Sequence, residues 1–358
     1  MPPLLRFITY RLLFVPVTLF VITLTLYGMV MLTPPAERAT LYFPEGFNPD
    51  RLTQEKLQRY TEQIIIRNHL RDPFPVQYAL WVTNLVRGDW GWSVILRESV
   101  LSALLRRTPV TAELTIYSLL FFIPMGIISG VNAARKKDGM ADHRFRLAAF
   151  LATTTPPFVL ALVLLSIFYV LLRWFPPGRV SIRISQDLYD PAYQTFTGVL
   201  TVDGFLNGRP DISLDALRHL VLPVITLSLV HWATLGRVMR TTMVEELDKD
   251  YIIAGRARGL SDHSVVWRHA LRNSLSPALA SSALSAALLF TGVFVVEVIF
   301  NFKGVSDLVV AGVRGVPDAP TILGFAVYSV IVVMFIMLVF DIMQALFDPR
   351  VREGIIGS

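Results

Sequence analysis

LLFVPVTLFVITLTLYGMVML, residues 12–32, runs through the first part of the chain without one charged side chain. A helix needs roughly 20 apolar residues to cross the about 30 Å of hydrocarbon in a bilayer. Leu, Ile, Phe and Val each favour insertion at a helix centre, so this run predicts a transmembrane helix. Its length and the lack of a small-residue cleavage site favour a retained helix over a removed signal peptide.

The same pattern recurs along the rest of the chain. The other charge-free runs of spanning length are Leu114–Ala134, Leu147–Leu172, Leu275–Val296 and Ala319–Phe340. A further candidate, Leu220–Gly236, is shorter and contains His231, and it is expected to extend past Arg237 toward Met243. The sequence therefore predicts an all-α membrane protein with about six transmembrane helices.

Composition supports lipid as the solvent and excludes several classes of site. The chain has 358 residues, of which 53% are hydrophobic and 17% are charged, whereas soluble domains carry about 25% charged residues. The net charge of +6 comes without a block of Lys or Arg, so it indicates membrane topology and not nucleic-acid binding. With no cysteine in the sequence, disulfides, thiolate metal sites and a cysteine nucleophile are excluded.

Charges in the short loops predict the orientation. Basic residues concentrate at the N-terminus, between the second and third runs, between the fourth and fifth, and at the C-terminus: Arg6, Arg11, Arg135, Lys136, Lys137, Arg144, Arg146, Lys249, Arg256, Arg258, Arg268, Arg272, Arg350 and Arg352. Cytoplasmic loops carry the excess of Lys and Arg, so both termini are expected in the cytoplasm. The long segment from Pro34 to about Arg107 then faces outward.

The chain is expected to have two parts. Residues 1–108 hold the first span and the extracytoplasmic segment, in which Gln54–Arg71 has helical spacing and Trp81, Trp90 and Trp92 suit a membrane interface. Residues 109–358 hold a five-helix core. A polar insertion from about Trp174 to Arg218 is expected to be an irregular loop with possible short strands.

The predicted cytoplasmic loop reads EELDKDYIIAGRARGLSDHSVVWRHALRN, residues 245–273, within a loop of about 243–275. Its first part predicts a short helix with Leu247, Tyr251, Ala254 and Arg258 on one face. Gly259 can take the left-handed conformation that ends a helix.

Ser261 is then a good N-cap for a second short helix, and Leu260 with Val265 would form a hydrophobic staple around that cap. The second helix places apolar side chains beside basic ones: Val265, Val266, Trp267 and Leu271 beside Arg268, His269 and Arg272. Such a helix pair suits a groove on another protein, or equally an interfacial position on anionic lipid.

This loop resembles the EAA loop of dipeptide/oligopeptide-type permeases, which belong to ATP-driven, binding-protein-dependent (ABC) importers. The resemblance is carried by Asp250-Tyr251, Ala254, Ala257, Arg258, Gly259, Leu260 and HALRN at 269–273. Further similar motifs are FITYRLL at 7–13, PVQY at 75–78, GDWG at 88–91, LRHLVLP at 217–223, VEVIF at 296–300 and FDPR at 347–350. Two positions depart from the general importer loop, with Ile253 in place of Glu and Gly255 in place of Ala.

The resemblance implies a type I importer permease fold in the inner membrane and a transport subunit that is not an enzyme. Its implied partners are a second homologous permease, two ATPase subunits that bind ATP and Mg, and an extracytoplasmic solute-binding protein. The implied cargo is a peptide or a similar small solute. The residues expected to dock on the ATPase are Asp250, Tyr251, Ala254, Arg258, Gly259, Leu260, Val265 and His269.

The sequence offers no nucleotide site of its own, because no Gly-x4-Gly-Lys-Ser/Thr phosphate loop occurs. No cofactor, catalytic or metal site is expected in this chain. His231 and Glu297 are candidates for the lining of the transport pathway, since ionisable groups at membrane depth favour function. For His231 the alternative is a neutral packing histidine with one hydrogen-bond partner. An ion-coupled secondary transporter is the alternative function.

Overall fold

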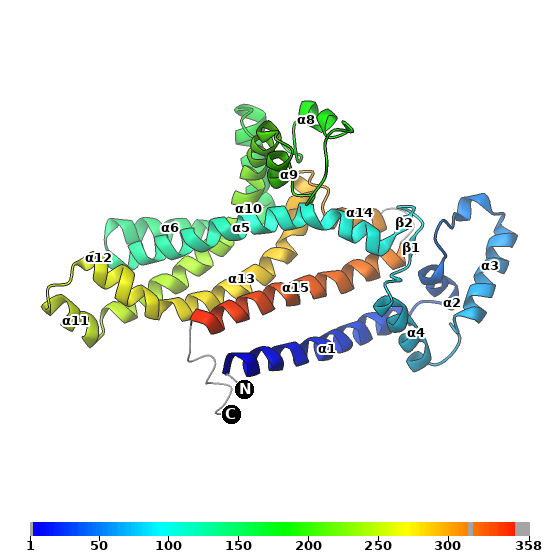
Figure 1. Cartoon of the computed structure of the whole chain (residues 1–358), viewed down its shortest axis with the longest axis horizontal. Helices are drawn as coiled ribbons and strands as arrows, with labels where there is room; N and C mark the ends of the chain where they lie inside the picture. The colour runs from blue at the N-terminus through cyan, green and yellow to red at the C-terminus, as the bar shows by residue number, and fades with distance from the viewer. Residues whose placement is uncertain (1–2, 314–317, 348–358) are drawn as a thin grey trace. The chain divides into compact units, whose positions relative to one another are not determined.

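The computed structural model describes residues 3–313 and 318–347, and most of these residues lie in helices (Figure 1). The chain divides into two compact units. The core unit comprises Met1–Ile8, Val110–Phe302 and Phe335–Ser358, and the N-terminal unit comprises Thr9–Pro109 and Lys303–Met334. Arg350 and Arg352, two of the basic residues that predict the orientation, lie outside the described residues, as do residues 348–350 of the FDPR motif.

Five helices in the described part of the chain are long and apolar enough to cross a membrane. They are α1 (Pro3–Val30), α5 (Val100–Arg135), α10 (Pro210–Leu247), the helix that runs through Asp262–Ile299, and α15 (Ala319–Phe347). A bent helix pair makes a sixth span if it is counted as one. The predicted all-α membrane fold with about six spans is therefore confirmed.

The bent pair corrects the expectation of one helix over Leu147–Leu172. Helix α6 (Met140–Thr154) is followed by α7 (Pro157–Leu164) and the π-helix η3 (Leu165–Leu171), with a bend of 103° at the break. The residue before a proline avoids the helical region, and Thr155 before Pro156 is extended, with φ −84° and ψ 118°. Pro157 then begins the next helix, where its missing N–H costs no hydrogen bond.

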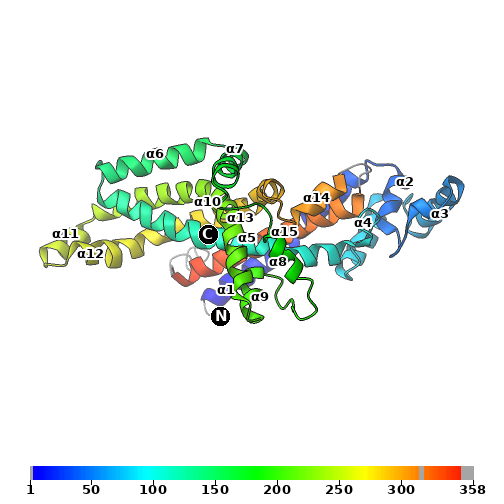
Figure 2. The ribbon, with the colours of Figure 1, turned by 90° about the horizontal axis from the view of Figure 1, so that it is seen from above.

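In the core unit, α10 packs against α6 and α13 (Leu271–Ile299) (Figure 2). It also crosses α5 at very short range. A Cβ atom on Gly130 would lie 2.6 Å from the backbone oxygen of Gly236, so a larger residue would push the two backbones apart. Beside this crossing, Trp232 Nε1 donates a hydrogen bond of 3.0 Å to Ser129 Oγ. Small residues permit such close helix approach in membranes.

The insertion at 174–218 differs from the expected loop with strands. Its described residues form α8 (Ile182–Asp187), α9 (Leu200–Leu206) and the start of α10, and they contain no strand. The carboxylate of Glu113 on α5, only 1% exposed, binds this insertion by an ion pair of 2.9 Å with Arg179. The backbone N–H of Thr201 donates to the same carboxylate at 2.9 Å. Glu113 therefore fixes the insertion to the helix core, which sequence periodicity did not reveal.

The N-terminal unit is built from short helices around buried aromatic rings. Its shorter elements are α2 (Pro35–Arg38), η1 (Ala39–Tyr42), η2 (Pro49–Arg51), α3 (Gln54–Arg67), α4 (Phe74–Val86) and α14 (Ser306–Val313). Trp81 is 7% exposed and stacks on Tyr27 at 5.0 Å between ring centroids. Trp81 therefore fills the core of this unit, and its expected place at a membrane interface stays a prediction.

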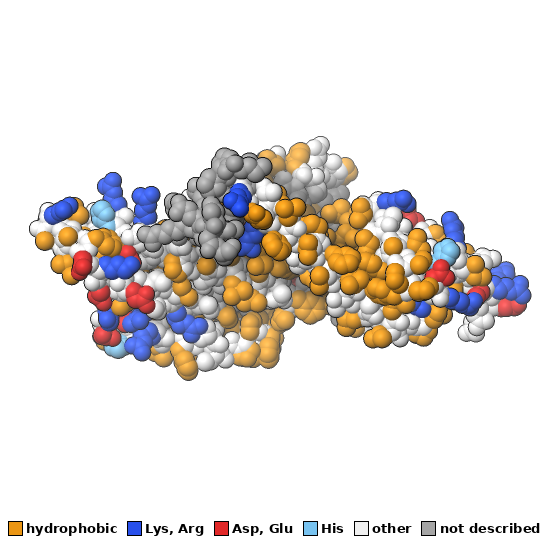
Figure 3. All heavy atoms as spheres, turned by 90° about the horizontal axis from the view of Figure 1, so that it is seen from below, with side chains coloured by type: hydrophobic (Ala, Val, Ile, Leu, Met, Phe, Trp, Pro, Cys, Tyr) orange, Lys and Arg blue, Asp and Glu red, His pale blue; other side chains and the backbone are white. Residues whose placement is uncertain are grey.

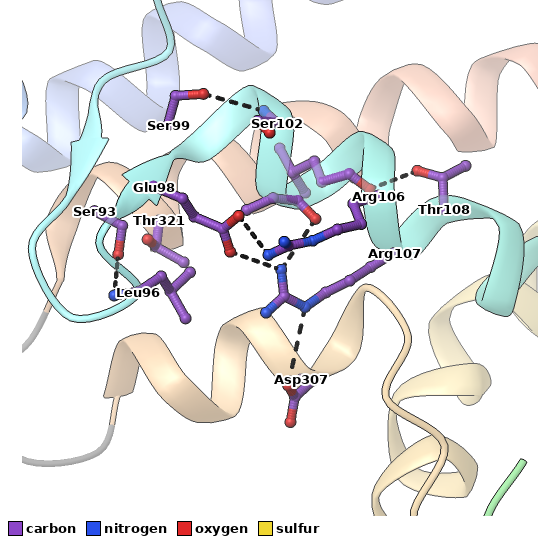
Figure 4. Close-up of polar contacts among 12 residues, drawn as sticks. Ser93, Leu96, Glu98, Ser99, Ser102, Arg106, Arg107, Thr108, Asp307 and Thr321 are labelled. Atoms are coloured by element: carbon purple, nitrogen blue, oxygen red, sulfur yellow. Dashed lines mark hydrogen bonds and ion pairs between the residues drawn. The ribbon is translucent and has the colours of Figure 1, made fainter. Parts of the chain in front are cut away.

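An ion-pair cluster joins three elements of the same unit (Figure 4). A hairpin of β1 (Trp92–Ser93) and β2 (Glu98–Ser99) leads directly into α5. Glu98 pairs with Arg106 at 2.5 Å and with Arg107 at 3.2 Å, and Arg107 lies 3.9 Å from Asp307 on α14. The loop before α15 therefore lies at the same end of this unit as the segment before α5. The predicted topology requires this arrangement, since both segments are expected to face outward.

Candidate functional site: the loop between α10 and α13

The loop that joins α10 to α13 forms a helix, a turn and a helix. Helix α11 (Asp250–Ala257) ends before Gly259, whose φ of +82° is in the left-handed region. Ser261 Oγ then accepts a hydrogen bond of 3.3 Å from the N–H of Ser264. Both local predictions, a glycine end and a serine N-cap, are confirmed.

Two expectations for this loop are wrong. Leu247 closes α10, and Asp248 and Lys249 separate it from α11, so it does not share a helical face with Tyr251. The second helix is not a separate short one, because α12 (Asp262–Ser264) and the π-helix η4 (Val265–Ala270) continue into α13 without a break. The fifth span therefore extends to the turn itself, and π-helical segments of this kind are frequent at functional sites.

A carboxylate at the end of α10 holds both arms of the loop. Glu246, 7% exposed, accepts hydrogen bonds from the Tyr251 hydroxyl at 2.6 Å and from Asn273 Nδ2 at 3.1 Å. Its other oxygen pairs with Lys249 Nζ at 2.5 Å. Burial and the bond to the Glu246 carboxylate raise the pKa of Tyr251 to about 12. Tyr251 therefore remains a hydrogen-bond donor at neutral pH.

A second set of charges fixes the turn to the end of α5. Asp262, at the start of α12, accepts a hydrogen bond of 2.7 Å from Arg135 Nε and lies 3.4 Å from Arg256 on α11. The basic loop after α5 and the basic loop after α10 therefore lie at one end of the core unit. Figure 3 shows charged side chains of both signs over this end, where α11 and α12 lie.

The structure places most of the predicted docking residues on the surface of the loop. The exposed ones are Asp250, Tyr251, Ala254, Arg258, Gly259, Leu260 and His269. Val265 differs, since it is 1% exposed and belongs to the hydrophobic core of this unit. Val265 therefore packs under the loop in the hydrophobic core, and its side chain is not accessible to a partner protein.

Sequence reasoning missed three contributors to this site. Ile253 is 58% exposed on α11 and adds apolar surface beside Ala254. The sequence did contain a signal for Ile253, because it stands where the general importer loop has a glutamate. Asn273 belongs to the HALRN motif, but its contact with Glu246 gave no signal, because that contact depends on the three-dimensional path of the loop.

The two candidate pathway residues behave differently from each other. Glu297, 1% exposed, accepts a hydrogen bond of 2.5 Å from Thr111 on α5. His231 lies with its ring 5.6 Å from that of Phe122. The expected hydrogen bond of His231 is not found with any described residue, so packing against an aromatic ring takes its place. Among the described residues, no group of three His, Cys, Asp or Glu side chains could hold a metal ion.

Comparison with known proteins identifies the family. Residues 123–353 match the family described as "Binding-protein-dependent transport system inner membrane component". The chain is 32% identical to the "Di/tripeptide transport system permease protein DppB" of Pseudomonas aeruginosa (strain UCBPP-PA14), over 98% of this chain and 99% of the relative. It is 33% identical to the "Probable D,D-dipeptide transport system permease protein DdpB" of Escherichia coli (strain K12), over 80% and 82%.

The matched region contains the last part of α5, four further long helices or helix pairs, and the whole loop between α10 and α13. The similarity to the Pseudomonas aeruginosa protein extends further, because it covers 98% of the chain and so includes the first span and the N-terminal unit. The long apolar helices thus agree with the comparisons, and the chain belongs to the binding-protein-dependent transport system inner membrane components, as a multi-pass permease of the type I ABC importer fold.

Proposed function

We propose that this chain is one of two homologous permease subunits in an importer of short peptides, and that the α11 loop couples it to an ATPase. The observation that carries this proposal is the apolar surface exposed along the α11 loop, together with the hydrogen bonds and ion pairs that hold this loop in place. Tyr251, Ile253 and Leu260 are 39%, 58% and 41% exposed, while Glu246 and Asp262 hold the loop to α10, α13 and α5. Exposed apolar groups rimmed by charges are typical of protein interfaces.

The partners follow from what the chain lacks and from the names of its relatives. The sequence contains no phosphate loop, so ATP and Mg are expected on two partner ATPase subunits, and the chain alone is expected to hydrolyse no ATP. The relatives are named as di/tripeptide and D,D-dipeptide transport system permease proteins, which supports peptides as the cargo. A solute-binding protein would deliver them from outside.

The orientation has both termini in the cytoplasm. The α11 loop and the basic Arg135 loop share one end of the core unit, and an excess of basic residues favours the cytoplasmic side. An ion-coupled carrier is not favoured by the described acidic side chains. Glu113 and Glu297 lie near the ends of apolar runs and are engaged by Arg179 and Thr111, whereas ion-coupled carriers bind at the membrane midplane.

Cysteine crosslinking tests the docking. The natural chain has no cysteine, so Ala254→Cys introduces its single thiol. In the assembled complex, we expect a short crosslinker with a maleimide at one end and a lysine-reactive succinimidyl ester at the other to join this thiol to an ATPase subunit. Val86→Cys, at an 80% exposed position of the N-terminal unit, is the matched control and should give no such product. Equal crosslinking of both variants, or of neither, would contradict the docking role of α11.

The same two variants test the orientation. A membrane-impermeant maleimide added to intact cells should label Val86→Cys and leave Ala254→Cys unmodified. In inside-out vesicles the pattern should reverse. Labelling of Ala254→Cys in intact cells would place α11 outside and refute both the topology and the coupling role.

A further inference from the structure

The N-terminal unit contains an open groove that the coupling function does not use. Its volume is about 1020 Å³, and it lies between η1, the end of α3, the turn after α4 and the first turns of α5. Ligand sites for small molecules typically measure roughly 300–1,000 Å³. In the proposed orientation, this groove opens on the outer side of the membrane.

Aromatic rings form much of its wall. They belong to Tyr42, Phe43, Tyr60, Trp90 and Trp92. The indole N–H of Trp90 donates to the backbone oxygen of Leu85 at 3.1 Å. The indole nitrogen of Trp92 is buried and has no hydrogen-bond partner among the described residues. The rings of the wall therefore offer faces on which an apolar side chain can pack.

Charged side chains of both signs line the same groove. Arg67 and Arg87 are exposed, and neither forms an ion pair with any described residue. Glu45 is also exposed and unpaired in that part of the chain, and Asp89 uses one oxygen to accept the N–H of Gly91 at 3.1 Å. Arg106 is different, because Glu98 neutralises it (Figure 4). Two cations and two anions are thus left to face a ligand.

We propose that this groove is a receiving site for short zwitterionic peptides with an apolar or aromatic side chain. The peptide carboxylate would bind Arg67 and Arg87, its ammonium group would bind Glu45 or Asp89, and its side chain would pack on the aromatic rings. This inference rests on the proposed function, since it assumes that peptides reach this surface.

The direct test is a binding measurement on the full chain in nanodiscs of phosphatidylethanolamine and phosphatidylglycerol. The probe is the dipeptide Ala-Phe with a 4-fluoro label, followed by fluorine NMR line broadening. We expect Arg67→Gln combined with Arg87→Gln to weaken binding about tenfold or more, which corresponds to roughly 1.4 kcal/mol. Arg71→Gln is the control, because Arg71 pairs with Glu62 at 2.8 Å and does not line the groove.

A ligand control remains decisive even if the double variant fails to fold. The N-acetylated, C-amidated form of the labelled peptide has lost both charges, and the natural chain should bind it at least about tenfold more weakly than the free peptide. Equal binding of the two forms would overturn the proposal, as would equal losses in Arg71→Gln and in the double variant. Broadening that occurs only when the solute-binding protein is added would show that the groove receives that protein and not the peptide.

The experiments distinguish failure of the proposed peptide site from failure of the proposed coupling role of α11. If Ala254→Cys crosslinks to an ATPase and the natural chain binds no peptide, the permease function stands and the receiving site is refuted. If the peptide binds but no crosslink forms, the outer site stands and the docking role of α11 is refuted.

Discussion

The hydroxyl of Tyr251 lies 2.6 Å from Oε1 of Glu246, and this bond links the first turn of α11 to the last turn of α10. Asn273 donates to the same oxygen at 3.1 Å from the start of α13. One carboxylate therefore connects the coupling helix to both helices that flank it. A movement of α11 would therefore be transmitted to α10 and α13 directly through these hydrogen bonds.

Tyr251→Phe removes the hydroxyl and keeps the ring. A hydrogen bond to a charged group contributes roughly 1.5–3 kcal/mol, and the partial exposure of Tyr251 favours a lower value of about 1 kcal/mol. We therefore expect the peptide imported per ATP hydrolysed to fall about fivefold in proteoliposomes that contain the complete transporter. Tyr189→Phe, at an 89% exposed position of the insertion, should leave that ratio unchanged. A ratio equal to that of the natural protein would mean that the bond does not transmit motion.

The same bond predicts a pH dependence. Burial and Glu246 raise the pKa of Tyr251 from 10 to about 12, so the folded state holds this proton more tightly than the unfolded state does. The stabilisation is fully present below pH 10 and is lost as the pH rises through about 12. The phenolate absorbance of the natural chain minus that of Tyr251→Phe should titrate near pH 12. In Glu246→Gln the corresponding midpoint should move toward 10, and an unchanged midpoint would separate Tyr251 from Glu246.

Local signals in the loop could be predicted from the sequence because they depend on neighbouring residues. The end of α11 at Gly259 and the cap at Ser261 need only a few residues of chain. The joining of the second short helix to α13 was missed, because a continuous helix and two short ones have similar periodicity. Glu246 and Asn273 meet only after the loop has folded back, so their contact has no sequence pattern.

For the membrane spans too, features set by neighbouring residues could be predicted from the sequence, whereas features set by contacts between distant residues could not. Apolar runs revealed the existence of the long helices, because lipid demands length and hydrophobicity at each of them. The 103° bend after α6 was underestimated, since two adjacent prolines permit a kink or a corner and packing decides which forms. The insertion at 174–218 was misjudged, because Glu113 and Arg179 are distant in sequence and both look like solvent-exposed charges.

Gly259→Ala tests the turn. Its φ of +82° lies in the region where a side chain costs roughly 1–2 kcal/mol, so the variant should strain the link between α11 and α12. We expect a loss of several-fold in peptide imported per ATP, with membrane insertion unchanged. Gly259→Pro should be more severe, since proline cannot adopt a positive φ.

Gly255→Ala is the matched control for that experiment. A Cβ atom at Gly255 would lie 3.5 Å from Leu260 and 3.9 Å from Val265, which is ordinary contact. Alanine inside a helix is favoured over glycine by up to about 1 kcal/mol, so this variant should couple at least as well as the natural chain. Loss of coupling in Gly255→Ala would show that the loop needs flexibility there, and equal effects of both variants would exclude a special role for the turn at Gly259.

The ion pair of Glu113 and Arg179 gives the last prediction. Removing one partner of a buried pair leaves an uncompensated charge and typically costs about 3–5 kcal/mol. Arg179→Met should therefore release the insertion, which we expect to detect as faster tryptic cleavage at the exposed Arg183 and a lower unfolding temperature in detergent. Glu113 would retain its bond from Thr201, so the cost should lie at the lower end of that range.

The double variant Glu113→Gln with Arg179→Met separates charge from packing. It removes both charges, and glutamine can still accept the hydrogen bond from Thr201, so most of the lost stability should return. Arg183→Met, at an exposed position of α8 without an ion pair among the described residues, should have little effect on the unfolding temperature. Arg179 also donates a hydrogen bond to the backbone oxygen of Gly198. If the double variant unfolds as early as Arg179→Met, the contribution of Arg179 lies in its packing and in that hydrogen bond, and not in neutralising Glu113.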